Sequence, residues 1–147
     1  MSFSQVHPGF AVSAQLLEAD VARAAEAGFR TLINNRPDFE APDQPTSAQI
    51  ESLCRAHGLT YLHAPTKAPT SPQDVASMAK ALGQASGPVL AYCRSGTRSI
   101  TLWAMVQAQN GTDIEQLIDA ARHAGYDLRG QAGALAGAQA DGNHAKG

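Results

Sequence analysis

Short apolar segments alternate with helical patterns along the first 128 residues, and this alternation most strongly constrains the fold. Strands joined through helices become parallel neighbours, because a parallel pair needs a long crossover connection. The sequence therefore predicts an α/β fold, a single domain with one mostly parallel central sheet flanked by helices. The segments that have the length and apolar content of strands are 9–12, 31–33, 59–63 and 88–92.

Capping residues mark the ends of several predicted helices. Thr46 and Gln49 form a capping box at the start of a helix that we expect to run to His57. Ser71, followed by Pro72, has the pattern of another helix start. Two further helices are expected at 100–109 and 113–124. The first helix ends near residue 27, and we expect its core face to hold Leu17, Val21, Ala24 and Ala25.

The length of 147 residues suits one hydrophobic core. We assign residues 1–128 to a catalytic domain. From residue 129 the composition changes to Ala, Gly and Gln, and Leu135 is the only large apolar side chain. We therefore expect residues 129–147 to form a flexible tail.

The formal net charge is −2, whereas proteins that bind nucleic acid present a basic patch, so we expect no nucleic-acid partner. No apolar stretch approaches the length of about 18 residues that a membrane helix needs. Because the first residues also lack the segments of a signal peptide, we expect a cytoplasmic protein without membrane association. Cys54 and Cys93 are then expected to be free thiols. Cys54 shares a helical face with Ile50 and Leu53, so we expect it in the core, with a resolving role against Cys93 as the alternative.

The segment at 93–99 carries the most specific chemical signal. A buried strand brings Cys93 to the carboxyl end of the sheet, where open α/β sheets bind ligands. The chain then enters a helix, and backbone N–H groups at a helix start bind anions. Those amides, together with Arg94 and Arg98, should favour the thiolate of Cys93. We predict that Cys93 is a nucleophile in an anion-binding loop. The alternative is a buried cysteine beside a turn with two solvated arginines.

Neighbouring loops carry further candidates. Arg36 and Asp38 follow the strand at 31–33, so they should lie at the same sheet edge as Cys93. Arg36 is expected to assist anion binding, and Asp38 to orient an arginine or carry a proton; a turn held by local bonds is the alternative. His63 ends another strand at this edge, where it could contact the loop, although a structural role is favoured. The histidines and cysteines lack metal-ligand spacing, so no metal or other cofactor is expected.

The loop at 93–98 resembles the active loop of rhodanese sulfurtransferases, Cys-Arg-x-Gly-x-Arg. It is also similar to the phosphate loop of protein tyrosine phosphatases, although the four residues between Cys93 and Arg98 are one fewer. Together with segments 6–10, 33–38, 87–93 and 102–104, it resembles the phosphatase-like domain of the beta-lactamase hydrolase-like proteins, also named as a sulfur transferase family. This resemblance covers residues 2–125 and implies a dual-specificity-phosphatase-like fold. It also implies a candidate partner, a separately encoded persulfide dioxygenase, because the family domain occurs fused to one.

Two catalytic functions fit this loop, and we favour sulfur transfer. The Cys93 thiolate would take sulfur from a small anionic sulfur donor and hold it as a persulfide, which needs no strong general acid. The alternative is a cysteine-dependent phosphatase, a hydrolase that cleaves a phosphate ester through a Cys93 phosphocysteine, with Arg98 holding the phosphoryl oxygens and Asp38 as the remaining acid candidate. A third possibility is a non-enzymatic anion- or protein-binding module. The residues expected to bind the substrate are Arg94, Ser95, Gly96, Thr97, Ser99, Arg36 and His63.

Overall fold

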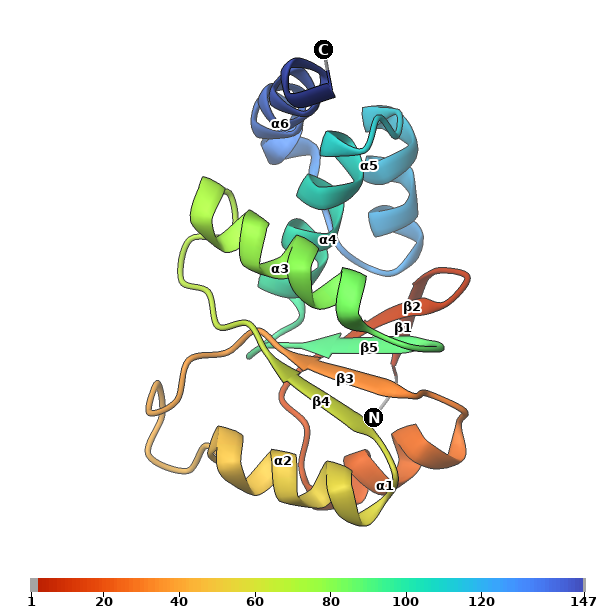
Figure 1. Cartoon of the computed structure of the whole chain (residues 1–147), viewed down its shortest axis with the longest axis vertical. Coiled ribbons are helices and arrows are strands. Elements are labelled where there is room, and N and C mark those ends of the chain that lie inside the picture. The colour runs from red at the N-terminus through yellow and green to blue at the C-terminus, as the bar shows by residue number, and fades with distance from the viewer. Residues whose placement is uncertain (1–2, 147) are drawn as a thin grey trace.

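A computed structural model describes residues 3–146, built around one five-stranded sheet in the order β1–β2–β5–β3–β4 (Figure 1). Strands β2, β5, β3 and β4 are parallel, and β1 pairs antiparallel with β2. The predicted single α/β domain with a mostly parallel sheet is confirmed. The extra strand β1 escaped prediction because it is a short, mostly polar edge strand without an apolar run. The strands are β1 (Ser4–His7), β2 (Phe10–Ser13), β3 (Thr31–Asn34), β4 (Thr60–His63) and β5 (Val89–Tyr92).

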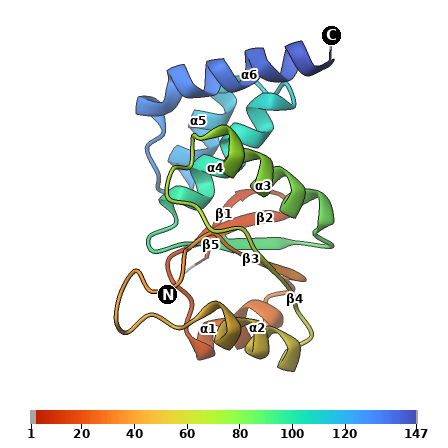
Figure 2. The same cartoon turned by 60° about the vertical axis from the view of Figure 1, so that its left-hand side comes forward.

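Helices cover both faces of the sheet (Figures 1 and 2). Helices α1 (Glu18–Glu26) and α2 (Ser47–Ala56) lie on one face; α3 (Pro72–Gln84), α4 (Thr97–Gln109) and α5 (Ile114–His123) lie on the other. The predicted capping box is confirmed, because the Gln49 N–H donates to Thr46 Oγ1 at 3.2 Å and the Thr46 N–H donates to Gln49 Oε1 at 2.8 Å. Ser71 caps α3 through the Asp74 N–H at 3.2 Å, as its sequence pattern predicts. None of the helices within the described residues is long and apolar enough to cross a membrane.

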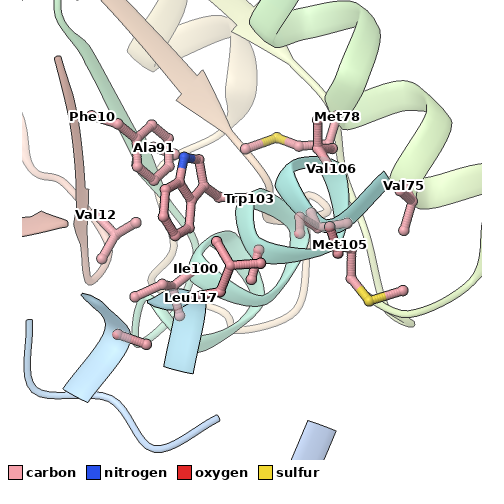
Figure 3. Close-up of a cluster of buried hydrophobic side chains, with 14 of the residues drawn as sticks. Phe10, Val12, Val75, Met78, Ala91, Ile100, Trp103, Met105, Val106 and Leu117 are labelled. Carbon is pink, nitrogen blue, oxygen red and sulfur yellow. The ribbon is translucent and has the colours of Figure 1, made fainter. Parts of the chain in front are cut away.

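Strand β5 is buried on both faces, which explains its unbroken apolar run. Val89 and Ala91 belong to the core under α3, α4 and α5, whereas Leu90 and Tyr92 face the core under α1 and α2. In the first of these cores the ring of Phe10 stacks on Trp103 with centroids 5.5 Å apart, and Figure 3 shows this pair. The sheet therefore has a rigid, well-packed centre, and β5 carries the chain through it to the site.

The expectation that Leu17 faces the core is wrong. Leu17 is 55% exposed, and Leu16 is fully buried in its place. Leu17 is the N-cap of α1 and has an extended backbone, so helical periodicity does not apply to its side chain.

The expectation of a flexible tail from residue 129 is also wrong for the part that the structure describes. A 3₁₀ turn, η1 (Arg129–Gln131), leads into helix α6 (Ala132–Lys146), which forms the outermost layer and packs against α4 (Figure 2). Leu135 is fully buried, and the Gln139 side-chain amide donates to the Thr112 carbonyl at 2.8 Å. Gly142 lies so close to the Gln109 carbonyl that a Cβ would collide with it. A composition poor in large apolar residues suggested a tail, but small residues let two helix backbones pack closely.

Candidate active site

The carboxyl ends of the four parallel strands lie in register at one edge of the sheet. Tyr92, the last residue of β5, pairs with Ser13 of β2 and with Asn34 of β3. Asn34 in turn pairs with His63, the last residue of β4. The loops that follow these strands therefore all start at the carboxyl end of the sheet. Cys93 is the first residue of the loop after the central strand β5.

Cys93 is fully buried and contacts its own loop. The Gly96 N–H donates to Cys93 Sγ at 3.1 Å. Gly96 has φ +95°, a left-handed conformation that suits glycine and turns the chain back toward the sulfur. Helix α4 begins at the next residue, and its first amides, including those of Arg98 and Ser99, have no acceptor within the helix. Such a loop can stabilise negative charge on a thiolate or on a bound oxyanion.

Arg98 is held in an ion pair with Glu40, a residue that our sequence reasoning missed. Arg98 Nη1 and Nη2 donate to the two Glu40 carboxylate oxygens at 2.9 and 2.8 Å, and Nη1 also donates to the Thr66 carbonyl at 2.9 Å. The hydrogen bonds from Arg98, with a second contribution from Arg36, lower the pKa of Glu40 to about 2. Glu40 is therefore ionised at neutral pH and serves as an anchor for Arg98. The pKa of Arg98 is raised, first by its bonds to Glu40 and also by nearby Cys93.

Arg36 is the second arginine that contacts Glu40. Its side chain is buried, and it donates to Glu40 at 3.1 Å and to the Gln15 side-chain oxygen at 2.9 Å. The His63 ring nitrogen Nε2 lies 3.1 Å from the Arg36 carbonyl. Arg36 therefore helps to hold Glu40, and His63 contacts the backbone of Arg36. Their expected contact with substrate stays a prediction.

Asp38 lies apart from the arginine pair. Its carboxylate accepts a hydrogen bond from the Ser47 N–H, at the start of α2, at 2.7 Å. A carboxylate is favourable at a helix N-terminus, so this contact matches the structural alternative for Asp38. The loop carries several acidic residues, and no local pattern shows that Glu40, two residues further on, is the one that reaches Arg98.

The loop after β4 supplies the Thr66 carbonyl that binds Arg98. Thr66 is buried, and its hydroxyl donates to the Asp74 carboxylate at the start of α3. The Ala68 N–H donates to the same carboxylate at 3.3 Å. Asp74, which the sequence marks as an ordinary residue of a helix start, therefore also braces this loop.

The other predicted loop residues divide by exposure. Arg94, Ser95 and Thr97 are exposed, and the Ser95 hydroxyl donates to Thr97 Oγ1 at 3.1 Å. Ser99 is fully buried, and its hydroxyl has no hydrogen-bond partner in the structure. A buried hydroxyl without a partner is unusual, so Ser99 is available to a thiolate or a ligand.

Cys54 is fully buried between the sheet and α2, which confirms its predicted core position. Burial raises the pKa of its thiol to about 12, so this cysteine is unreactive at neutral pH. Across the part of the chain that the structure describes, no group of three or more His, Cys, Asp or Glu side chains could hold a metal ion.

The fold and the cysteine loop together define a phosphatase-like α/β domain, in which a parallel sheet presents a cysteine and an arginine at the carboxyl end of its central strand. Residues 2–110 match the family "Beta-lactamase hydrolase-like protein, phosphatase-like domain". The chain belongs to this family, as the resemblance of its loop motifs implies.

Curated relatives agree with this assignment. The chain is 33% identical over 133 residues to a beta-lactamase hydrolase-like protein of Agrobacterium fabrum, and 31% identical over 130 residues to one of Xylella fastidiosa. In each case the match covers 87% of this chain, which spans 30% of the relative's length.

Solved structures give the same fold. A Neisseria meningitidis protein that has been proposed to be a phosphatase is 36% identical, with a TM-score of 0.84 over 94% of this chain and 99% of that one. Kinase associated phosphatase matches with a TM-score of 0.72 over 97% of this chain and 96% of that one. At 14% identity this second match shows the fold alone. The expected dual-specificity-phosphatase-like fold is thereby confirmed.

Proposed function

We propose that this chain is a cysteine-dependent phosphatase that hydrolyses phosphate monoesters through a Cys93 phosphocysteine. The observation that carries the proposal is the way Arg98 is held. Its two bonds to Glu40 and one to Thr66 use both hydrogens of Nη1 and one of Nη2. The Nε hydrogen and the second Nη2 hydrogen remain, and they form a fork that matches two oxygens of a tetrahedral oxyanion.

Two displacements follow from this arrangement. In the first, the Cys93 thiolate attacks phosphorus, the bond to the leaving oxygen breaks, and the phosphoryl group is transferred to sulfur. Arg98 and the loop amides stabilise the charge on the non-bridging oxygens. In the second, water attacks phosphorus, and Cys93 leaves as the thiolate while inorganic phosphate is released. The Gly96 N–H, 3.1 Å from Sγ, and the Ser99 hydroxyl stabilise that departing thiolate.

The leaving oxygen sets the substrate class. Glu40 is ionised by the two arginines, Asp38 accepts from the start of α2, and Asp74 accepts from Thr66 and Ala68. These three carboxylates are therefore committed to structural bonds, and Asp43 of the same loop is exposed, so we assign Asp38 a structural role. Without a poised general acid, esters with a weakly basic leaving group, such as aryl phosphates, are favoured over alkyl phosphates.

Phosphate release from p-nitrophenyl phosphate and from glycerol phosphate tests the proposal. We expect the aryl ester to be hydrolysed about 100-fold faster or more, since general acid catalysis is worth about that much for a basic leaving group. Cys93→Ser should abolish turnover, and the matched variant Cys54→Ser should retain it. Absence of turnover in the wild type, or full turnover in Cys93→Ser, would overturn the proposal.

Sulfur transfer is the second candidate. One observation favours it: the four-residue spacing makes a smaller ring around Cys93, and sulfite leaves a sulfur donor without needing a proton. The matched family is described as a phosphatase-like domain, and the Neisseria structure with 36% identity is named as a proposed phosphatase, which supports phosphate hydrolysis instead. A reducible mass gain of one sulfur atom on Cys93 after incubation with thiosulfate, with no hydrolysis of aryl phosphate, would reverse this order. A persulfide dioxygenase would be a candidate partner only if sulfur transfer is the function.

A further inference from the structure

Tyr126 reaches the cysteine loop from a distant part of the chain. It lies between α5 and η1, beyond residues 2–110 that match the family. Its hydroxyl donates to the Ser95 carbonyl at 2.9 Å. The same peptide group carries the Gly96 N–H that donates to Cys93 Sγ. Because the C=O and N–H of a planar trans peptide point in opposite directions, the Tyr126 hydroxyl and the sulfur hold this peptide from its two sides.

Gly96 adds a second contact. A Cβ on Gly96 would collide with the Tyr126 hydroxyl, so the ring packs directly against the loop. The backbone of Tyr126 is itself fixed, since its N–H donates to the Ala121 carbonyl of α5 at 2.8 Å. Burial, and then the charge of Cys93, raises the pKa of Tyr126, so its hydroxyl stays protonated and can donate.

We propose that Tyr126 is a positioning residue, whose hydroxyl fixes the Ser95–Gly96 peptide with its N–H toward Cys93 Sγ. This deepens the proposed function, because it concerns the nucleophile of that reaction. Without the hydroxyl, a loop with glycine at its centre can rotate this peptide and turn a carbonyl oxygen toward the sulfur. A donor on the carbonyl side also polarises the peptide, which strengthens the N–H bond to a thiolate.

The charged and titratable groups around the sulfur come from three places. Arg98 of α4 attracts the thiolate directly, Tyr126 of the α5–η1 segment lies across the Ser95–Gly96 peptide from it, and Arg94 lies exposed in the loop. Glu40 acts on the sulfur only through its pair with Arg98. The substitution Tyr126→Phe removes only the tyrosine hydroxyl and leaves the charges of Arg98, Arg94 and Glu40 in place.

The test measures alkylation of Cys93 by iodoacetamide as a function of pH, in a Cys54→Ser background. Tyr126→Phe is expected to slow alkylation at mildly acidic pH about tenfold, because a hydrogen bond to a charged group is lost. The midpoint of the pH profile should move upward. The matched control Tyr61→Phe removes a hydroxyl that bonds Ser47 and Asn34, and it should leave the profile unchanged. An unchanged profile in Tyr126→Phe, or equal slowing in Tyr61→Phe, refutes the proposal.

Gly96→Ala provides a second variant. It strains the left-handed backbone at Gly96 and also pushes the Tyr126 hydroxyl away, so it should slow alkylation at least as much as Tyr126→Phe does. Alkylation of Gly96→Ala at the wild-type rate would count against the proposal. Alkylation requires no phosphatase turnover, so the two hypotheses can fail separately. Slow alkylation in Tyr126→Phe without any ester hydrolysis by the wild type would remove the proposed function alone.

Discussion

Glu40→Gln removes the one negative charge that lies between Arg36 and Arg98. The ordinary glutamate pKa of 4.5 falls to about 2 in this site. At about 1.4 kcal/mol for each pKa unit, this lowering corresponds to about 3 kcal/mol of stabilisation. The Glu40 side chain remains 24% exposed, and solvent screening leaves about 1 to 2 kcal/mol of that value. Glutamine keeps the shape and can still accept a hydrogen bond, so the variant isolates the charge.

Urea unfolding at a series of pH values measures this contribution. At pH 7 we expect the midpoint of Glu40→Gln to lie about 0.5 to 1 M below wild type, given the usual urea dependence of a small domain. The folded pKa is the lower one, so the contribution is full above pH 4.5 and is lost as pH falls through about 2. The difference between the two proteins should therefore shrink to less than half by pH 3. Glu26→Gln, an exposed carboxylate at the end of α1, should match wild type throughout. A difference that is absent at pH 7, or that stays constant down to pH 3, would mean that the Glu40 charge does not stabilise the fold through the two arginines.

Three further substitutions have definite expected outcomes. Arg98→Lys should lower kcat/KM for an aryl phosphate by about 100-fold or more, because an ammonium cannot reproduce the guanidinium fork; exposed Arg55→Lys on α2 is the control, and a mild effect at Arg98 would exclude it as the anion clamp. Phe39 is 85% exposed and has φ +66°, a conformation that glycine adopts without strain. Phe39→Gly should therefore leave the free energy of unfolding unchanged or raise it by about 1 kcal/mol in thermal unfolding, and a clear loss would mean that the ring makes a contact in solution. Gly142→Ala should destabilise the protein by about 1 to 3 kcal/mol in urea unfolding, because the new methyl meets the Gln109 carbonyl. The control Gly137→Ala, which meets nothing, should stabilise α6 by about 0.5 to 1 kcal/mol; equal effects at both positions would mean that α6 is not docked.

The features that sequence predicts well here are set by nearby residues. The capping box at Thr46 and Gln49 and the cap at Ser71 are local hydrogen bonds, so their spacing is enough to locate them. The apolar run before Cys93 predicts a buried strand because both of its faces are covered. The turn of the loop around Cys93 and the start of α4 behind it follow from the same local order of strand, cysteine, glycine and helix.

Features that depend on contacts distant in sequence were missed. Glu40 meets Arg98 across 58 positions, and Tyr126 meets Ser95 across 31, and neither distance leaves a periodic signal. The docking of α6 depends on Gly142 and small neighbours whose value appears only when α4 lies beneath them. The short polar strand β1 is specified by its neighbour β2 more than by its own side chains.

Trapping the phosphoenzyme shows whether Cys93 carries the phosphoryl group during hydrolysis. The protein is mixed with p-nitrophenyl phosphate, quenched in acid within one turnover, and its intact mass and peptide map are measured beside Cys93→Ser. We expect a gain of one phosphoryl group on the peptide that contains Cys93, in wild type alone, together with a matching burst of p-nitrophenol. Steady release of p-nitrophenol without any adduct on Cys93, or no release at all, would contradict it.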